Sequence, residues 1–357
     1  MATYKSIKYI IPAAVVEHTD SINALSDVDT TTTAPTDGQT LKWNGTNWVP
    51  GDLEIAATQK AIFGFGKADS GETNITNIVS STGVVAADTT GVGTAREAIS
   101  ATGYGEDKAI FGFGNTGSSP YRTNLSNLVS NTGVVATDST GVGTTKYRLA
   151  AACYGGDKGI FAFGSDHNSS SQWTSHKNLV SNTGVVATDT TNAGTARRDL
   201  AAASYGTDKA IFGFGDTGSS TNITNLVSNT GVISSDVTGV GTSREKIGAS
   251  GYGGNKAIFG GSIENDKHKT NLVSATGIVA SDVTGVGESR WGYAGSVYGG
   301  DKGIFGFGTN NTLKYGMYTE EYGNFVRLIS NIGVVASDST GAGTARDDLG
   351  AAGFSLT

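Results

Sequence analysis

Cysteine, proline and charge are all scarce in this sequence. Cys153 is the only cysteine in 357 residues, so no disulfide can form within the chain and its stability must come from packing. Only 4 prolines occur beside 53 glycines, and 16% of the residues are charged. This composition is typical of many short strands joined by tight turns.

Long apolar runs and basic clusters are also missing. The apolar stretches near the start are shorter than a signal-peptide core or a membrane span. We therefore expect that the protein is made in a cytoplasm and does not insert into a membrane. The formal net charge is −7 and no run of Lys and Arg occurs. A nucleic-acid partner is therefore not expected, because it needs clustered basic residues.

Metal-binding patterns do not occur either. The four histidines lack the H-E-x-x-H spacing, and Cys153 has no cysteine partner for zinc. The Asp-containing turns carry one carboxylate each, far below the roughly six to eight oxygens that calcium takes. We expect neither a metal nor a cofactor.

The chain is organised around a repeat, Lys60-Ala-Ile-Phe-Gly-Phe-Gly66. Five further copies follow at intervals of 46 to 51 residues, and they begin at Lys108, Lys158, Lys209, Lys256 and Lys302. A period of this size is typical of the blades of a β-propeller. Residues 53–357 are thus predicted to form one repeat domain.

Each repeat is predicted to be a four-stranded antiparallel blade. In the second copy the expected strands are Ala109–Phe113, Thr123–Ser130 and Val134–Asp138, followed by Tyr147–Tyr154 as the first strand of the next blade. Alternation along Ala109–Phe113 predicts Phe111 and Phe113 on one face, opposite a face with the small Gly112.

The two ends of the repeat region complement each other. The first copy lacks a matching first strand, whereas Arg346–Phe354 repeats that strand in register and is not followed by a second one. We therefore predict an all-β fold: a six-bladed β-propeller of four-stranded antiparallel blades, closed by the C-terminal strand joining blade 1. Closure would leave no exposed sheet edges.

Residues 1–52 are predicted to form an N-terminal docking arm with a β-hairpin. Asn44-Gly45 is typical of a type I′ turn, which would set Trp43 opposite Thr46 and Leu41 opposite Trp48. Leu41, Trp43 and Trp48 would then share one apolar face. A small hairpin is not stable alone, so this face should dock on the rest of the chain, on a partner subunit or on further copies of the arm in a homo-oligomer.

Two resemblances follow from these residues. The order of an aromatic-Gly turn, Ile-Phe-Gly-Phe-Gly, a variable loop, a strand pair and Gly-Thr-Ala-Arg resembles the kelch family, although only Gly260-Gly261 keeps its double glycine and its late Trp is absent. The segment Leu25–Gly51 resembles structural proteins of tailed, particularly marine, phages. This resemblance implies a location in the virion and other phage structural proteins as partners.

Acidic and basic residues recur eight positions apart between blades. The pairs in sequence are Asp88 and Arg96, Asp189 and Arg197, Asp236 and Arg244, Asp282 and Arg290, and Asp338 and Arg346, with Asp138 and Lys146 as the variant. Such a set could bind an ion at the mouth of a propeller or pin loops and neighbouring blades. Because every blade carries it, we interpret it as structural.

Variation between copies is concentrated in the loops between the second and third strands. The two longest hold Trp173 and His176 in one case and Tyr315, Tyr318 and Tyr322 in the other. Exposed aromatics among Ser, Asn and Gly suit glycan stacking or a protein contact, and the alternative is that they fold back on their own blades.

Three functions are compatible with these features. The first is a non-enzymatic structural or decoration protein of a phage particle, with residues 1–52 docking and the propeller projecting as a rigid head. The second is a host-surface glycan or receptor-binding head of a tail fibre. The third is a propeller glycosidase, which is the weakest because its two carboxylates need distinct environments whereas the repeat supplies equivalent ones.

Overall fold

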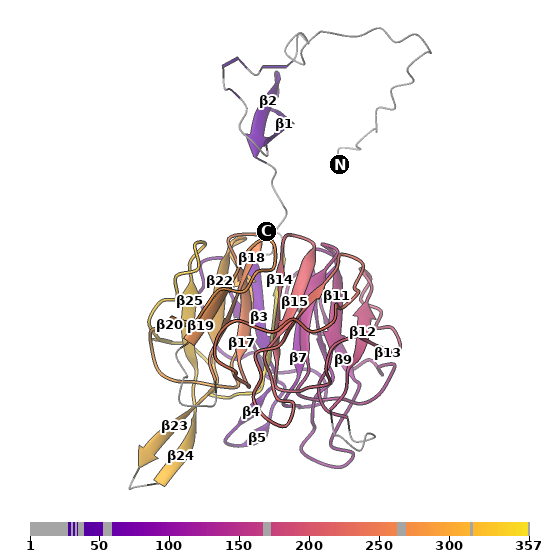
Figure 1. The fold of residues 1–357 in the computed structure, drawn as a ribbon, viewed down its shortest axis with the longest axis vertical. Helices are drawn as coiled ribbons and strands as arrows, with labels where there is room; N and C mark the ends of the chain where they lie inside the picture. The colour runs from indigo at the N-terminus through magenta and orange to yellow at the C-terminus, as the bar shows by residue number, and fades with distance from the viewer. Residues whose placement is uncertain are drawn as a thin grey trace. The chain divides into compact units, whose positions relative to one another are not determined.

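The computed structural model describes residues 28–29, 31–32, 34, 39–52, 59–166, 173–262, 269–314 and 317–355. These residues form antiparallel sheets of two to four strands and no helix, so the fold is all-β in the part of the chain that is described (Figure 1). None of them forms a helix capable of spanning a membrane. The chain divides into two compact units, Met1–Ile55 and Ala56–Thr357.

The smaller unit contains a hairpin whose register differs from the predicted one. Strands β1 (Gln39–Trp43) and β2 (Trp48–Asp52) place Trp43 opposite Trp48 and Leu41 opposite Pro50. The prediction of a two-residue turn was wrong because Asn44 Oδ1 accepts hydrogen bonds from the backbone N–H groups of Thr46 and Asn47 at 2.9 and 2.8 Å. The loop therefore has four residues, and only Gly45 in it has a positive φ.

The larger unit contains six main sheets among its described residues. Each begins with a strand that we call inner, followed by the Lys-initiated strand of the repeat. The inner strands are β27 (Gly350–Phe354), β7 (Ser100–Tyr104), β10 (Ala150–Tyr154), β14 (Ala201–Tyr205), β17 (Gly248–Tyr252) and β21 (Ala294–Tyr298). The second strands are β3 (Lys60–Gly64), β8 (Lys108–Gly112), β11 (Lys158–Ala162), β15 (Lys209–Gly213), β18 (Lys256–Gly260) and β22 (Lys302–Gly306).

The third strands complete the regular part of each sheet. They are β6 (Thr76–Val79), β9 (Ser126–Val129), β12 (His176–Val180), β16 (Thr224–Val227), β19 (Lys269–Val273) and β25 (Phe325–Ile329). Three sheets have a fourth strand of two residues: β13 (Thr190–Thr191), β20 (Val283–Thr284) and β26 (Ser339–Thr340). In the other three, isolated bridges such as Ser126 to Ser139 take its place, so the predicted fourth strand is present only in part.

Two additional hairpins lie within the loops between second and third strands. Strands β4 (Lys67–Ala68) and β5 (Gly71–Glu72) form the first, and β23 (Thr309–Lys314) and β24 (Met317–Tyr322) form the second. Both project from the same end of the larger unit (Figure 1).

The first sheet joins the two ends of the repeat region. Strand β27 pairs antiparallel with β3, with Gly350 opposite Gly64 and Phe354 opposite Lys60, and β3 pairs in turn with β6. The predicted union of the C-terminal strand with the first repeat is therefore present. We number the sheets from this one, so that β7, β10, β14, β17 and β21 begin the second to sixth sheets.

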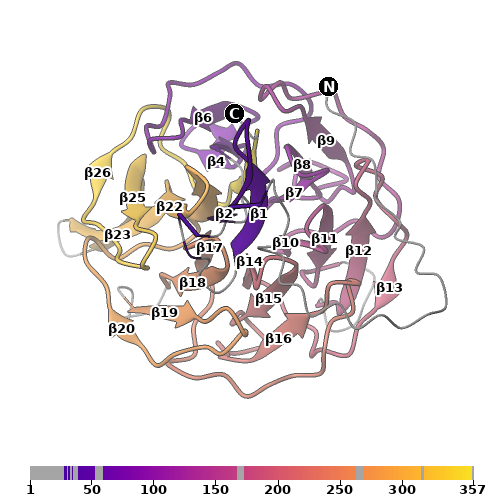
Figure 2. The same ribbon diagram turned by 90° about the horizontal axis from the view of Figure 1, so that it is seen from above.

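The inner strands also pack against one another. Strand β7 contacts β10, β10 contacts β14, β14 contacts β17, β17 contacts β21, β21 contacts β27 and β27 contacts β7. Figure 2 shows the larger unit from above, with the inner strands β7, β10, β14 and β17 toward the middle and the outer ones at the rim. Each inner strand thus has two inner strands as neighbours.

Aromatic pairs connect neighbouring sheets. Tyr293 and Phe305 pair within the sixth sheet, whereas five pairs join different sheets: Phe65 with Phe111, Phe113 with Phe161, Phe163 with Phe212, Phe214 with Phe259, and Phe307 with Phe63. Centroid separations of 5.1 to 5.4 Å are in the favourable range for such pairs. The last pair connects the sixth sheet to the first.

The prediction that Phe111 and Phe113 share a face was wrong. Phe113 has φ of 65°, which turns the chain at the end of β8, so Phe111 points to the first sheet and Phe113 to the third. Gly112 does provide the expected space, because a Cβ there would lie 2.8 Å from Phe161 Cζ. Bulky and small residues therefore alternate between neighbouring sheets.

Candidate functional site

The larger unit has two ends that differ in regularity. We call the end with the turns from first to second and from third to fourth strands the turn face. The opposite end, which carries the loops from second to third strands and the links between sheets, is the loop face; β4, β5, β23 and β24 project there (Figure 1). Those candidate residues of the repeat domain that the structure describes lie toward the loop face.

Buried charge clusters occupy the links that enter each sheet. Arg96, which is 0% exposed, donates from Nη1 to Asp138 Oδ1 at 3.3 Å and from Nη2 to Asn127 Oδ1 at 2.5 Å. Asn127 Nδ2 donates to the same Asp138 at 2.9 Å, and Thr94 donates to Asp138 through its N–H and its hydroxyl. The cluster thereby ties the start of the second sheet to its outer end.

This arrangement corrects the pairing suggested by the sequence. The partner of each basic residue is the aspartate one repeat further on, and the pairs are Arg96 with Asp138, Lys146 with Asp189, Arg197 with Asp236, Arg244 with Asp282, Arg290 with Asp338 and Arg346 with Asp88. The eight-residue spacing spans the link between two sheets, and each residue bonds within the sheet it belongs to.

Sequence reasoning missed the asparagine of these clusters. Asn77, Asn127, Asn178, Asn225 and Asn271 each donate to the aspartate of their own sheet. The available signal was a polar residue at one fixed position of the third strand in five copies. In the sixth sheet Arg327 replaces the asparagine and pairs with Asp338.

The surroundings of the clusters keep both the basic residue and the aspartate in their charged forms, so that the two attract each other. Burial lowers the pKa of Arg197 to about 10, and Asp236 partly offsets this effect. Burial opposes ionisation of Asp282, yet hydrogen bonds from Thr242 and Asn271 outweigh it and lower its pKa to about 2. Both groups are therefore charged at neutral pH, and their polar atoms are engaged within the sheet rather than directed to solvent.

Trp173 and His176 lie where the third sheet meets its long loop. Trp173 is half-buried, with the guanidinium of Arg198 5.9 Å from its ring centroid. A Cβ on Gly218 of the fourth sheet would lie 3.2 Å from the Trp173 ring. His176 is half-buried at the start of β12 and pairs with Thr191. Trp173 thus packs toward the neighbouring sheet.

The three tyrosines predicted to bind a partner belong to the loop of the sixth sheet. Tyr318 lies on β24 opposite Leu313, and Tyr322 ends that strand opposite Thr309 and is half-buried. Tyr315 lies outside the described residues. Tyr318 and Tyr322 stand four residues apart on one strand.

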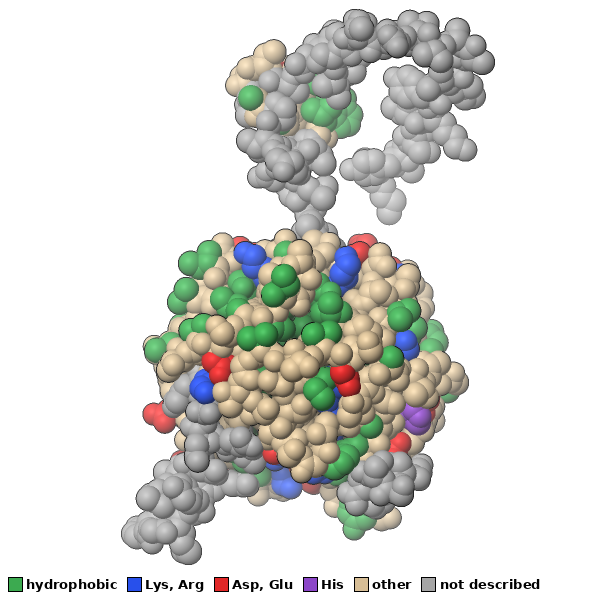
Figure 3. Space-filling model, in the orientation of Figure 1, with side chains coloured by type: hydrophobic (Ala, Val, Ile, Leu, Met, Phe, Trp, Pro, Cys, Tyr) green, Lys and Arg blue, Asp and Glu red, His purple; other side chains and the backbone are tan. Residues whose placement is uncertain are grey.

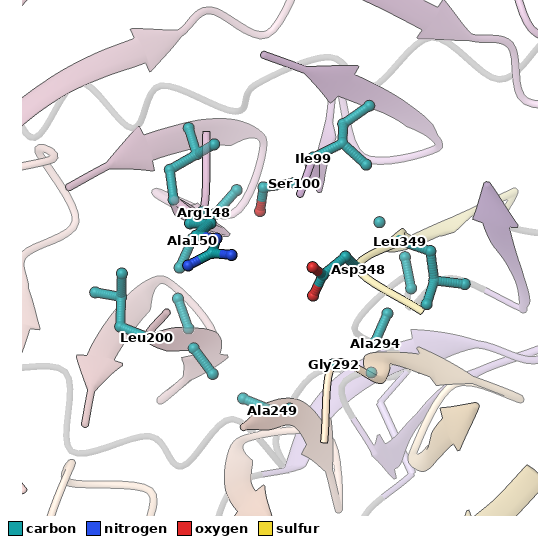
Figure 4. A pocket seen from close by; sticks show the side chains of 18 of the residues that line it. Ile99, Ser100, Arg148, Ala150, Leu200, Ala249, Gly292, Ala294, Asp348 and Leu349 are labelled. Atoms are coloured by element: carbon teal, nitrogen blue, oxygen red, sulfur yellow. The ribbon is translucent and has the colours of Figure 1, made fainter. Parts of the chain in front are cut away.

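A cavity of about 110 Å³ opens between the first residues of the inner strands. Six residues with φ of 49 to 65°, which we call the rim residues, stand at corresponding positions around it: Ala98, Arg148, Asp199, Lys246, Gly292 and Asp348. Figure 4 shows Arg148 and Asp348 directed toward each other across the cavity. No motif in the sequence marks these residues.

Backbone hydrogen bonds connect successive rim residues. The N–H of Arg148 donates to Ala98 O, that of Asp199 to Arg148 O, that of Lys246 to Asp199 O, that of Gly292 to Lys246 O and that of Asp348 to Gly292 O, at 2.8 to 3.0 Å. Left-handed backbone at non-glycine residues is unusual and costs about 1 kcal/mol or more. These bonds account for the conformation but not for the choice of side chains.

Acidic groups gather at two places beside the cavity. Asp199, Asp216 and Glu245 have carboxylate oxygens within 4.8 Å of one another, and Arg198 contacts Asp199 and Asp216 at 3.4 and 3.0 Å. The arginine neutralises much of this cluster, so a metal site does not follow from it.

The second group consists of Asp347, Asp348 and Glu97. Burial, followed by the charge of Asp348, raises the pKa of Asp347 to about 8, although Thr309 Oγ1 donates to its carboxylate at 2.7 Å. Burial also raises the pKa of Glu97, and Lys67 opposes this at 3.4 Å. This side of the cavity has more carboxyl groups than nearby cations.

Comparison with known proteins leaves the family open. The sequence matches no protein-family model, and no curated protein matches it significantly. The kelch and phage resemblances therefore remain predictions.

Proposed function

We propose that the larger unit is a closed six-bladed β-propeller of kelch-like type. The pairing of β27 with β3 supports closure, as does the contact of Phe307 in the sixth sheet with Phe63 in the first. Equivalent aromatic contacts connect four further pairs of successive sheets, and the inner strands β17 and β21 pack together between the fifth and sixth sheets. The packing of each inner strand on the next, repeated six times and returning to its start, is what a propeller requires.

We further propose that this protein is a non-enzymatic structural or decoration protein of a phage particle. Residues 1–52 dock it to other phage structural proteins, and the propeller projects as a rigid head. The observation that carries the docking role is the cross-strand pair Trp43 and Trp48, which are 51% and 40% exposed with ring centroids 5.7 Å apart. Paired aromatics with this exposure are typical of the centre of an interface.

Deletion and substitution test the docking role. Removing residues 1–52 should abolish incorporation into particles while leaving a soluble propeller. Trp43→Ala with Trp48→Ala should lower incorporation at least about tenfold, since each buried Trp anchor contributes on the order of 2 kcal/mol or more. Thr46→Ala, in the loop of the same hairpin, is the matched control. Incorporation of the double variant at the normal copy number would contradict the proposal.

A second candidate function rests on the loop face. The loop of the sixth sheet forms the hairpin β23–β24 at this end, with Tyr318 and Tyr322 on β24. Stacking of such tyrosines on a sugar would make the head a receptor for a host-surface glycan. The isolated full chain should then bind host cells or a glycan array, and Tyr322→Ala should reduce that binding. Absence of binding by the wild-type chain would reject this candidate.

A further inference from the structure

The rim residues differ from one sheet to the next although the scaffold does not require it. Ala98 and Gly292 occupy the same backbone conformation and the same hydrogen-bonded series as the others, so no polar side chain is needed at this position. Four of the six positions nevertheless hold a charged residue in left-handed backbone. Elsewhere the inner strands repeat small residues, as in Ala150–Ala152 and Ala201–Ala203.

The charges around the cavity are unevenly distributed. Arg148, Asp199 and Lys246 follow one another on one side, and Asp348 stands on the other between Gly292 and Ala98. Glycine and alanine flank Asp348 among the rim residues, and its carboxylate is directed across the cavity toward Arg148 (Figure 4). A Cβ on Gly292 would lie 3.1 Å from Asp348 Oδ1 and 3.3 Å from Asp347 Oδ2, so the lack of a side chain at Gly292 leaves room for these carboxylates.

The polar groups on both sides retain unused binding capacity. Within the described residues, no hydrogen bond or ion pair engages the carboxylate of Asp348. Lys246 Nζ lies 4.0 Å above the Trp291 ring, a contact that leaves its N–H groups available. Arg148 meets Asp199 through Nη1 at 3.3 Å, so the remaining donors of its guanidinium are not used by that pair.

We propose that this cavity binds a small zwitterion of the α-amino acid class, with its carboxylate held by Arg148 and Lys246 and its ammonium group held by Asp348. Asp347 and Glu97 lie behind Asp348, so this side of the cavity has more acidic than basic groups and favours a cation. A volume of about 110 Å³ corresponds to a few water molecules at roughly 30 Å³ each, which is enough for a molecule of this size.

Binding of the full chain to glycine and alanine, measured by calorimetry or by NMR titration, tests the proposal. Acetate and methylammonium serve as probes that carry one charge each. We expect glycine to bind, each single-charge probe to bind at least about tenfold more weakly, and Asp348→Asn to weaken glycine at least about tenfold, because a charge-assisted pair is lost. Asn tolerates left-handed backbone, so this variant should keep the fold.

A matched control removes the same charge from the turn face. Asp208→Asn breaks the exposed pair with Lys209, 2.7 Å long, and should leave glycine binding unchanged. Lys246→Met should weaken glycine and acetate but not methylammonium. The proposal is overturned if wild type does not bind glycine, if Asp348→Asn binds it as well as wild type, or if methylammonium binds as tightly as glycine. None of these outcomes depends on whether the protein belongs to a virion.

Discussion

The turn face and the loop face of the larger unit are built on different principles. On the turn face the same contacts recur: the N–H of Gly105 donates to Asp157 O, that of Gly155 to Asp208 O, and that of Gly299 to Gln59 O. On the loop face the sheets carry loops of different length and rim residues of different charge. The turn face is uniform because each sheet meets the next with the same geometry there.

This difference separates the residues that hold the fold from those available for recognition. An exposed apolar side chain occupies the same turn position in each sheet on the turn face, namely Val84, Val134, Val185, Val232, Ile278 and Val334, and the sixth sheet adds Ile332. Figure 3 shows hydrophobic side chains in several small groups among polar ones, with most of the groups in the upper half of the larger unit. A uniform face suits a symmetric or purely structural contact, whereas a face that differs at every position suits a single asymmetric ligand.

The largest effect should come from the buried clusters that each sheet needs equally. Arg197→Met removes hydrogen bonds to Phe214 O, Thr195 O and Asn225 Oδ1 at 2.7 to 3.1 Å. We expect the free energy of unfolding to fall by about 3–5 kcal/mol, because the partners stay buried without the cation. Lys209→Met, at an exposed ion pair, should cost less than about 1 kcal/mol. Equal costs in chemical denaturation would contradict the structural role.

Substitutions at two separate glycines of the turn face test how tightly neighbouring sheets pack there. A Cβ on Gly184 would lie 3.0 Å from Tyr104, whereas one on Gly254 would meet nothing within 4 Å, and both residues have positive φ. Gly184→Ala should destabilise by about 2–4 kcal/mol and Gly254→Ala by about 1 kcal/mol, since only the first adds a clash to the backbone cost. If thermal unfolding shows the same loss for both, the contact between sheets is not tight.

On the loop face one substitution should stabilise the protein. The raised pKa of Asp347 means that the folded state keeps a proton that the unfolded state releases near its ordinary pKa, so stability falls as pH rises from about 4 toward 8. Asp347→Asn removes this dependence of stability on pH, and the new amide oxygen can still accept the hydrogen bond from Thr309 Oγ1. The gain should be roughly 1–3 kcal/mol at pH 8 and near zero at pH 4. A gain that does not vary with pH would reject the assignment.

The smallest effect is expected from the projecting hairpin. Replacing residues 311–320 by two glycines keeps the pair Asn310 and Glu321 and shortens only a surface loop. The free energy of unfolding should change by less than about 1 kcal/mol, since loop length has a weak effect on stability. A larger loss in denaturant titration would show that the loop face also holds the fold.

The regular features were predictable from the sequence and the irregular ones were not. The repeat of Lys60–Gly66 indicated the second strands, and the match of Arg346–Phe354 to earlier first strands indicated the pairing of β27 with β3. The left-handed turn at Phe113 was missed because alternation assumes an extended backbone up to the last residue.

The candidate sites were harder to predict for a related reason. Spacing along the chain does not reveal which sheet a link belongs to, so Asp88 was matched with Arg96 instead of Arg346. The rim residues carry no motif, since they come from six separate repeats and meet only around the cavity. The predicted register of the hairpin was wrong because Asn44 can accept hydrogen bonds from the backbone of a longer loop as well as enter a turn with positive φ.

A circular permutant tests the central claim, closure of the propeller by the C-terminal strand. Thr344–Ser355 is moved in front of Gln59 with one glycine between, so that the first sheet is built from continuous chain and the protein ends at Gly343. The single glycine reproduces the turns of the other sheets, where residues such as Gly156 have positive φ, and Gln59 N already donates to Ser355 O at 2.7 Å. We predict cooperative thermal unfolding within a few degrees of wild type, because no contact between sheets is changed. An unfolded or strongly destabilised permutant, next to a wild-type chain that folds, would contradict closure.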